Sequence, residues 1–377
     1  MTRRICYLTG TRADYGLMRR TLDAIAAHPD LSLELIVTGM HLDPRHGHTV
    51  SEIEAGGLTI AGEIQVQLSE EDEAFMARAI ARTIEGCCDI FEASRPDLLL
   101  LLGDRGEMLA GAIAAIHLNI PVVHIHGGER SGTVDEPVRH AISKLSHYHF
   151  TATADAAERL GRMGEDPQSI FVVGAPGLVS LEQEAIAERE ACLAIAGWPS
   201  DRAFALLVFH PVVQRAAEGG DEMRELLAAL RRAGLWIVAL QPNADMGGEA
   251  IRAVLEEAKD AGDLALFTHL ERDVFVSMMA HADVMIGNSS AGIIEAASVG
   301  TPVVNVGSRQ RLRERSGNVI DADANPAELD RALAEARARG RLQTGNVYGD
   351  GRTAERIASL LATLPVSGSV LEKCCVY

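Results

Sequence analysis

Short apolar runs alternate with helical patterns along almost the whole chain, and this alternation limits the possible folds more than any other feature. The run Leu98–Leu102 is an extreme case, since it consists of consecutive leucines. Apolar runs of this length are typical of strands that are buried on both faces. Strands that alternate with helices form parallel sheets with helices on both sides. We therefore predict an α/β protein with doubly wound parallel sheets.

The apolar runs form two series, separated by the turn residues around Gly174-Ala-Pro-Gly177. The strands predicted before this turn are 4–8, 32–37, 97–102, 120–125, 147–151 and 169–173. Those predicted after it are 204–209, 235–240, 264–267, 284–286, 302–305 and 319–320. Helical patterns between the strands include 15–27, 71–94, 106–118, 221–232 and 271–280.

A chain of 377 residues is too long for one ordinary core. We predict two Rossmann-like domains, residues 1–176 and 177–364, followed by a flexible tail, residues 365–377. A helix over 181–196 is expected to open the second domain.

The composition of the chain disfavours some classes of binding partner. A formal net charge of -18 argues against nucleic acid or an anionic membrane as the main partner. The apolar run after Arg3-Arg4 is too short for a signal peptide, and no stretch approaches the ~18 apolar residues of a membrane span. We therefore expect a cytoplasmic protein. An acidic chain can still bind an anionic small molecule through a few arginines.

The stretch 124–149 contains the densest group of ionisable residues and directly follows a predicted strand. Ligands of open α/β sheets bind at the carboxyl ends of the strands. The candidate site residues here are His124, His126, Glu129, Asp135 and Arg139. Glu129 and Asp135 are candidate acid/base groups, and Arg139 can hold a carboxylate in register. His126 could instead bind zinc, but no third His or Cys follows at a familiar spacing, so we expect no metal.

Two earlier turns also carry polar groups at strand ends. At the first, backbone N–H groups and a helix N-terminus favour an anion. Arg12 could bind a phosphate or carboxylate there, and Asp14 could bind a sugar hydroxyl or simply cap the helix. At the second, Asp104 is a candidate base and Arg105 a phosphate ligand, unless the two form an ion pair that caps the next helix. The spacing GxGxxG is absent, which disfavours a nicotinamide cofactor.

The second half repeats this pattern. His210 ends a predicted strand and could donate to a diphosphate or a leaving oxygen, although an ordinary strand-end histidine is the alternative. The run Gly287-Asn-Ser-Ser290 offers hydroxyls and free amides at a helix start, which suits a diphosphate unless it is only a capping box. Glu295 could accept from ribose hydroxyls. The candidates in this half are His210, Asn243, Ser289, Ser290, Glu295 and Arg309.

Taken together, the motifs TRADYG, TGMH, GDR, HIHGGE, SGT-x-DE-x-x-RHAISKL, FHP, PNAD and GNSS-x-G-x-x-E span nearly the whole chain. This combination resembles the UDP-N-acetylglucosamine 2-epimerase family, in particular its hydrolysing branch in sialic and legionaminic acid biosynthesis. The resemblance implies a GT-B fold, in which two Rossmann-like domains face each other across a cleft. It also implies a C-terminal helix near 352–361 that packs on the first domain, a homodimer or homotetramer, and no cofactor.

The resemblance further implies two sets of contacts. UDP would contact Arg12, Arg105, His210, Asn243, Ser289, Ser290, Glu295 and Arg309. The sugar would lie between Asp14, Asp104, His124, Glu129, Asp135 and Arg139. Non-hydrolysing relatives carry a catalytic Glu where this chain has His126, so the acid or base at that position stays open.

The implied reaction is anti elimination followed by hydration. A base removes the C2 proton while UDP leaves C1, and the resulting 2-acetamidoglucal gains water at C1 and a proton at C2. The products are UDP and N-acetylmannosamine. We predict Asp104 and Asp135 as the proton-transfer pair, with His210 and Arg105 stabilising the leaving diphosphate.

Other functions are compatible with the same fold. The nearest is the same reaction on UDP- or GDP-linked 2,4-diacetamido-2,4,6-trideoxyglucose, in the legionaminic acid pathway. A non-hydrolysing epimerase is disfavoured by the HIHGGE and SGT motifs. A glycosyltransferase would need an acceptor surface, and a nucleotide-sugar-binding regulator would not need so many carboxylates.

Overall fold

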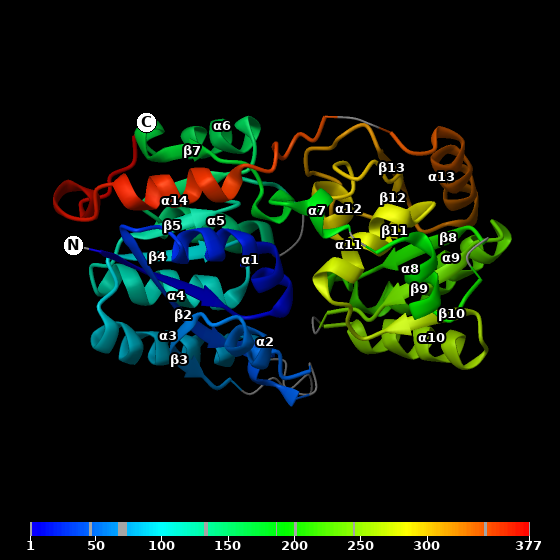
Figure 1. The fold of residues 1–377 in the computed structure, drawn as a ribbon, viewed down its shortest axis with the longest axis horizontal. Coiled ribbons are helices and arrows are strands. Elements are labelled where there is room, and N and C mark those ends of the chain that lie inside the picture. The colour runs from blue at the N-terminus through cyan, green and yellow to red at the C-terminus, as the bar shows by residue number, and fades with distance from the viewer. Residues whose placement is uncertain are drawn as a thin grey trace. The chain divides into compact units, whose positions relative to one another are not determined.

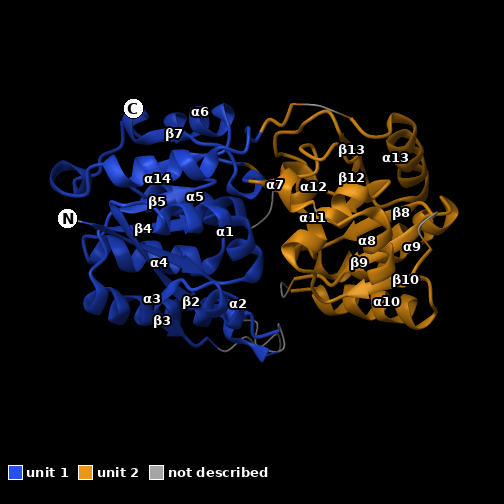
Figure 2. Cartoon of the chain, viewed as in Figure 1, with its two compact units in different colours: residues 1–129, 135–179, 348–377 blue, residues 130–134, 180–347 orange. Residues whose placement is uncertain are grey.

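The computed structural model describes residues 2–44, 47–66, 74–131, 135–185, 187–199, 202–243, 246–342 and 345–376. The chain divides into two compact units (Figure 2). Unit 1 comprises residues 1–129, 135–179 and 348–377, and unit 2 comprises residues 130–134 and 180–347. Each unit contains one parallel sheet, so the prediction of two doubly wound domains is confirmed.

The sheet of unit 1 has the strand order β3-β2-β1-β4-β5-β6-β7 (Figure 1). Its strands are β1 (Arg3–Thr9), β2 (Leu31–Thr38), β3 (Thr59–Ile64), β4 (Leu98–Leu102), β5 (Val122–Ile125), β6 (Tyr148–Thr151) and β7 (Ile170–Val172). Its helices are α1 (Arg12–Ala26), α2 (Val50–Ala55), α3 (Phe75–Ser94), α4 (Gly106–His117), α5 (Asp135–Leu145), α6 (Ala154–Arg162) and α14 (Thr353–Thr363). The direction of strand addition reverses between β1 and β4, and such a switch point is where this class of sheet binds ligands.

The leucine run of β4 shows why the sequence forms this sheet. Successive side chains of a strand point to opposite faces. Leu98, Leu100 and Leu102 accordingly pack in the core that includes α1 and α14. Leu99 and Leu101 pack in the other core, which includes α3 and α4. An uninterrupted apolar run is therefore required wherever a strand has helices on both sides.

Helix α14 belongs to unit 1, although it follows unit 2 in the sequence. Its residues Ile357 and Leu361 are buried in the same core as Ile5 of β1. Thr353 donates a hydrogen bond to the carbonyl of Ala175 at 3.2 Å, within the same unit. The core beside β1 is thus completed by residues from the C-terminal part of the chain.

The sheet of unit 2 has the strand order β10-β9-β8-β11-β12-β13, with a corresponding reversal between β8 and β11. Its strands are β8 (Phe204–Val208), β9 (Trp236–Leu240), β10 (Leu264–Phe267), β11 (Val284–Gly287), β12 (Val303–Val306) and β13 (Val319–Ala322). Its helices are α7 (Leu181–Glu184), α8 (Arg189–Ile195), α9 (Gly219–Arg232), α10 (Gly248–Asp260), α11 (Arg272–His281), α12 (Ser290–Ile294) and α13 (Pro326–Arg339).

One strand and one helix differ from the sequence predictions. Strand β3 was not predicted, because it is an edge strand whose residues are mostly half-buried or exposed. The single helix predicted over 181–196 is wrong: the segment forms α7 and α8. Between them, the N–H of Ala187 donates to the hydroxyl of Ser277 at 3.2 Å rather than to a helical carbonyl.

Among the residues that the structure describes, no helix is long and apolar enough to cross a lipid bilayer.

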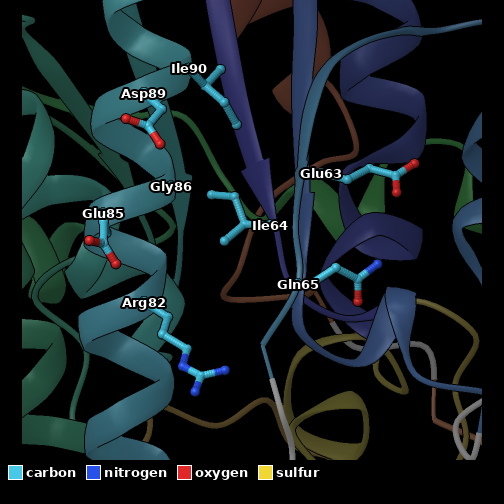
Figure 3. Close-up of a pocket in the computed structure, with 8 residues that line it drawn as sticks. All are labelled: Glu63, Ile64, Gln65, Arg82, Glu85, Gly86, Asp89 and Ile90. Carbon is cyan, nitrogen blue, oxygen red and sulfur yellow. The ribbon is translucent and has the colours of Figure 1, made fainter.

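The edge strand β3 and helix α3 border a groove of about 420 Å³ (Figure 3). Charged side chains line much of it, including Glu63, Arg82, Glu85 and Asp89. The groove lies at the edge of the sheet, whereas the switch point of unit 1 lies between β1 and β4. The groove therefore does not lie at the switch point.

The switch point of unit 2 generates a first testable prediction. Gly287 ends β11 with φ +135°, and a Cβ there would overlap the carbonyl oxygen of Val208 in β8. Gly287→Ala should therefore destabilise the protein by about 3 kcal/mol or more, from backbone strain and overpacking together. Gly161→Ala is the control, since a Cβ in that helix of unit 1 meets nothing within 4 Å. Urea unfolding measures both, and equal stabilities would contradict the close approach.

Candidate functional site

The predicted site residues of each unit lie after strands that flank its switch point or are next to those that do. In unit 1 they follow β1, β4 and β5, and in unit 2 they follow β8, β9, β11 and β12. Parallel strands end at one edge of a sheet, so residues far apart in the sequence become neighbours there.

The turn after β1 is organised by Asp14. Its carboxylate accepts hydrogen bonds from the N–H groups of Gly10 and Thr11 at 3.1 and 2.8 Å, and from the hydroxyls of Tyr7, Thr9 and Thr11. Thr11 in turn caps α1, which completes a capping box. A carboxylate offers about four acceptor positions. These contacts match the capping alternative and leave Asp14 little capacity for a sugar hydroxyl.

Arg12 is the first residue of α1, and its Nε lies 2.8 Å from Oε2 of Glu52. His41, in the TGMH motif, was not among the site residues predicted from the sequence. The ring of His41 is buried between the hydroxyls of Thr9 and Thr49, at 2.9 and 2.8 Å. Burial lowers the pKa of His41. This histidine therefore ties the turn after β1 to the segment that leads into α2.

Asp104 and Arg139 form the central ion pair of unit 1. Arg139 is 1% exposed, and its NH2 group pairs with Oδ2 of Asp104, while NH1 donates to the carbonyl of Glu129 at 3.0 Å. The Asp104 side chain is 22% exposed. The Nε of Arg105 lies 3.3 Å from Oε2 of Glu107. Arg139 thus joins the loops after β4 and β5.

His124, for which a sugar contact was predicted, is fully buried, and both of its ring nitrogens have partners within unit 1. Nε2 lies 2.7 Å from the carbonyl of Gly103, and Nδ1 lies 3.0 Å from the hydroxyl of Ser143. Burial lowers the pKa of His124 to about 3, so the ring is neutral. Because a carbonyl only accepts, the proton is on Nε2, and Nδ1 is an acceptor that faces the Ser143 hydroxyl. His124 holds the loop beside Asp104.

The Gly-Gly turn after β5 places His126 and Glu129 in contact. Nδ1 of His126 pairs with Oε1 of Glu129, whose side chain is 4% exposed. His126 has a φ of +63°, a left-handed conformation that is costly for a residue with a Cβ and is found at functional sites. Gly128 has a φ of +79°, and a Cβ there would overlap the carbonyl oxygen of Ala156. The turn is therefore closely packed against α6.

Helix α5 begins at Asp135, which is half-buried, and Arg139 follows one turn later. Residues four apart lie on the same face of a helix. Asp135 is therefore on the face of α5 that carries the partner of Asp104. The neighbouring His140 has its Nε2 3.9 Å from Glu136, and burial lowers its pKa.

In unit 2, His210 is held between the ends of β8, β9 and β11. Its ring Nδ1 accepts from the backbone N–H of Asn243 at 3.2 Å. The backbone N–H of His210 donates to Oδ1 of the Asn288 side chain at 2.7 Å. Burial, with a smaller contribution from Arg309, lowers its pKa to about 3. The ring is neutral, and its proton is on Nε2, because Nδ1 accepts. His210 can therefore donate a hydrogen bond from Nε2.

Asn288, within the GNSS run, is a functional candidate that the sequence analysis did not name individually. Besides binding the backbone of His210, it accepts at its carbonyl from Arg309 at 3.3 Å and from Gln310 at 3.2 Å. Ser289 caps the following helix α12, accepting from the N–H of Ala291 at 3.4 Å, and Ser290 begins that helix. Asn288 thus connects the predicted diphosphate residues of β8, α12 and the turn after β12.

Glu295 is buried next to a partner that the sequence analysis missed. NH1 of Arg272 lies 2.6 Å from Oε2 of Glu295, and Nε of Arg272 lies 3.2 Å from Glu184. Burial raises the pKa of Glu295, while Arg272 acts in the opposite direction. The sequence feature that could have indicated Arg272 is the charged run Glu271-Arg272-Asp273, at the start of a helix after β10. Any ribose contact of Glu295 must share this carboxylate with Arg272.

The buried histidines predict how stability depends on pH. The folded protein keeps His124 and His210 neutral down to about pH 3, whereas the unfolded chain protonates them near 6.5. The unfolded state therefore binds more protons, and the free energy of unfolding must fall as the pH drops from 6.5 toward 3.

Urea unfolding at pH 7.5 and pH 5 should show this loss. His124→Gln should reduce the difference between the two pH values, while the same change at His117, exposed at the end of α4, should not. A stability difference that is identical in the wild type and in His124→Gln would contradict the neutral, buried state of His124.

Comparison with known proteins identifies the family. Residues 23–362 match the family model described as UDP-N-acetylglucosamine 2-epimerase. A UDP-N,N'-diacetylbacillosamine 2-epimerase (hydrolyzing) of Legionella pneumophila is 51% identical over 377 residues, which is 100% of both chains. A UDP-N-acetylglucosamine 2-epimerase of Neisseria meningitidis is 34% identical and covers 95% of both chains.

Solved structures agree on the fold. A UDP-GlcNAc 2-epimerase of Neisseria meningitidis bound to UDP-GlcNAc matches with a TM-score of 0.80 at 18% identity, over 95% of this chain and 99% of that one. At this identity the match shows the fold alone, and it confirms the predicted GT-B fold. The sequence matches extend this from the fold to the family. The chain belongs to the UDP-N-acetylglucosamine 2-epimerase family and is a nucleotide-sugar 2-epimerase.

Proposed function

We propose that this enzyme hydrolyses UDP-N,N'-diacetylbacillosamine with inversion at C2, releasing UDP and the free 2,4-diacetamido sugar. The observation that carries the proposal is the 51% identity, over the entire chain, to the Legionella pneumophila enzyme named for that reaction. The UDP-N-acetylglucosamine 2-epimerase of Neisseria meningitidis is 34% identical. UDP-N-acetylglucosamine was the substrate expected first from the sequence, and this difference in identity favours the alternative expected there, the 2,4-diacetamido sugar.

The residues of unit 2 form the proposed UDP site. The neutral ring of His210 supports this role, because its Nε2 proton can bond to a diphosphate oxygen without an ion pair to break. Arg309, which lies near His210, supplies positive charge for the diphosphate. We assign the remaining contacts to Asn243, Ser289, Ser290 and Glu295, and to Arg12 and Arg105 of unit 1. The homodimer or homotetramer implied by the resemblance, and the cytoplasmic location expected from the sequence, are part of this proposal.

The residues of unit 1 carry the proposed proton transfers. In the elimination, a base takes the C2 proton, the C2–H electrons form the C1–C2 double bond, and the C1–O electrons leave with UDP. In the hydration, water adds its oxygen to C1, and an acid protonates C2 on the opposite face. Asp104 and Asp135 are the proposed pair, because Arg139 orients the former and lies on the same helix face as the latter. His126 with Glu129 is the alternative pair, held in mutual contact.

The substrate is tested by proton and phosphorus NMR in D2O with each of the two UDP-sugars. We expect rapid release of UDP from UDP-N,N'-diacetylbacillosamine, with deuterium at C2 of the free sugar. Faster turnover of UDP-N-acetylglucosamine would instead indicate that this enzyme acts on the sugar nucleotide for which the 34% identical relative is named. If UDP is released from neither UDP-sugar, hydrolysis is contradicted and a binding role is favoured.

The role of Asp104 is tested by Asp104→Asn. Turnover should fall by at least ~10²-fold, since one positioned acid/base group contributes about that much. Affinity for UDP, measured by calorimetry, should stay nearly unchanged, because the proposed UDP site lies mostly in unit 2. Asp155→Asn, on the surface of α6, is the control. If Asp104→Asn loses UDP binding as well, Asp104 has a structural role.

A further inference from the structure

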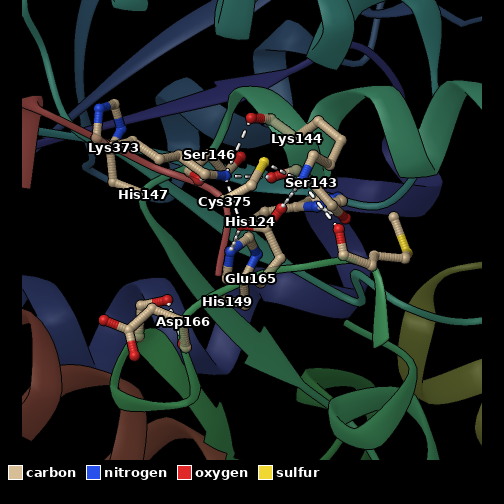
Figure 4. A network of polar contacts seen from close by, with 12 residues as sticks. His124, Ser143, Lys144, Ser146, His147, His149, Glu165, Asp166, Lys373 and Cys375 are labelled. Carbon is tan, nitrogen blue, oxygen red and sulfur yellow. Dashed lines mark hydrogen bonds and ion pairs between the residues drawn. The ribbon is translucent and has the colours of Figure 1, made fainter. Parts of the chain in front are cut away.

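The C-terminal segment, residues 365–376, lies beyond residue 362, where the match to the family model ends. The sequence predicted a flexible tail here, but the segment makes specific contacts with unit 1 (Figure 4). The carbonyl of Pro365 accepts from the Tyr148 hydroxyl at 2.8 Å, and the N–H of Val376 donates to the Gly164 carbonyl at 2.9 Å. Between these two points lies Lys373.

The ammonium group of Lys373 caps the C-terminal end of α5. Nζ donates to the carbonyls of Ser143 at 3.1 Å, Lys144 at 3.0 Å and Ser146 at 2.5 Å. The last carbonyls of a helix have no partners within it and carry partial negative charge. A lysine from a distant part of the chain therefore provides the cation that stabilises this helix end.

A buried carboxylate holds Lys373 in place. Oε2 of Glu165 lies 2.5 Å from Nζ of Lys373 and 2.9 Å from Nε2 of His149, and Oε1 lies 2.8 Å from Nζ of Lys144. The Glu165 side chain is fully buried. Burial acts to raise the pKa of Glu165, but the hydrogen bonds from His149, Lys144 and Lys373 outweigh it and hold the pKa at about 2. Glu165 is therefore charged, and the ammonium groups of Lys144 and Lys373 compensate its charge.

The same helix end is connected to the candidate site. Ser143 offers its carbonyl to Lys373, while its hydroxyl lies 3.0 Å from Nδ1 of His124. His124 in turn holds the carbonyl of Gly103, next to Asp104. One turn before Ser143, Arg139 pairs with Asp104 directly. A displacement of the end of α5 would thus change the position of Asp104 by two routes.

We infer that Lys373 is a positioning residue for the proposed active site: by fixing the end of α5, it sets the positions of Arg139, His124 and Asp104. This inference rests on the proposed function, in which Asp104 transfers a proton. A tail that only stabilised unit 1 would change the free energy of unfolding and leave the turnover of the folded enzyme unchanged. A positioning residue changes kcat at temperatures where the variant is fully folded.

The test uses full-length Lys373→Met, which keeps an apolar stem without the charge, and Lys373→Arg, which restores a cationic donor. Lys259→Met is the control, since this exposed lysine pairs only with Glu256 among the ion partners that the structure describes. Hydrogen exchange reports on α5 and on the loop after β4, and steady-state kinetics with UDP-N,N'-diacetylbacillosamine reports on turnover.

For Lys373→Met, we expect faster exchange at residues 143–146 and 103–105 and a decrease in kcat of about tenfold, because small misplacements of catalytic groups cost up to ~10²-fold. KM should change little, since the proposed UDP contacts are mostly in unit 2. Lys373→Arg should recover most of kcat. If Lys373→Met does not fold, Lys373→Gln, which keeps an amide donor, replaces it with the same expectations.

Faster exchange at 143–146 with unchanged kcat would overturn the inference and leave the tail a purely stabilising role. Unchanged exchange at both segments would also overturn it, because the cap would then not restrain α5. If the wild type turns over neither UDP-sugar, the proposed function fails. The exchange of residues 103–105 in Lys373→Met then decides whether the tail positions Asp104.

Discussion

The ion pair between Arg139 and Asp104 is the contact on which the organisation of unit 1 at its switch point depends. A guanidinium that is almost completely buried requires a compensating charge, because removing its partner costs about 3–5 kcal/mol. The pair can form only if β4 and β5 are adjacent and parallel, and the observed register, Leu101 opposite His124, provides this. Once it forms, Arg139 also binds the backbone of Glu129, so one side chain fixes the loops after both strands.

Neutral histidines have a related function in both units. His124 and His210 are buried, and each has one nitrogen that accepts from the protein and one that carries the proton. A ring with a pKa of about 3 is a poor source of protons near neutral pH, but a good hydrogen-bond donor. In the proposed reaction, His210 therefore stabilises the leaving diphosphate by a hydrogen bond. The proton balance then rests on the carboxylates of unit 1.

The sequence predicted those parts of the structure that depend on local pattern. Strands buried on both faces, such as β4, are recognisable in the sequence as apolar runs. The polar residues that follow these runs indicate where the candidate site lies. Strand β3 was missed because an edge strand needs no such run. The partners of the site residues were not predictable either. The pairing of Asp104 with Arg139, and that of Glu295 with Arg272, depends on how distant segments are brought together.

The return of the chain to unit 1 after residue 347 has a consequence for biosynthesis. Unit 2 is almost continuous in sequence, whereas the core beside β1 lacks Ile357 and Leu361 until the last segment has been made. During translation, which proceeds from the N-terminus, the first unit to begin folding is therefore the last to be completed. Until then the nascent chain exposes an apolar face on the sheet, in the region that α14 later covers. A ribosome-bound intermediate of this protein would present that face to chaperones.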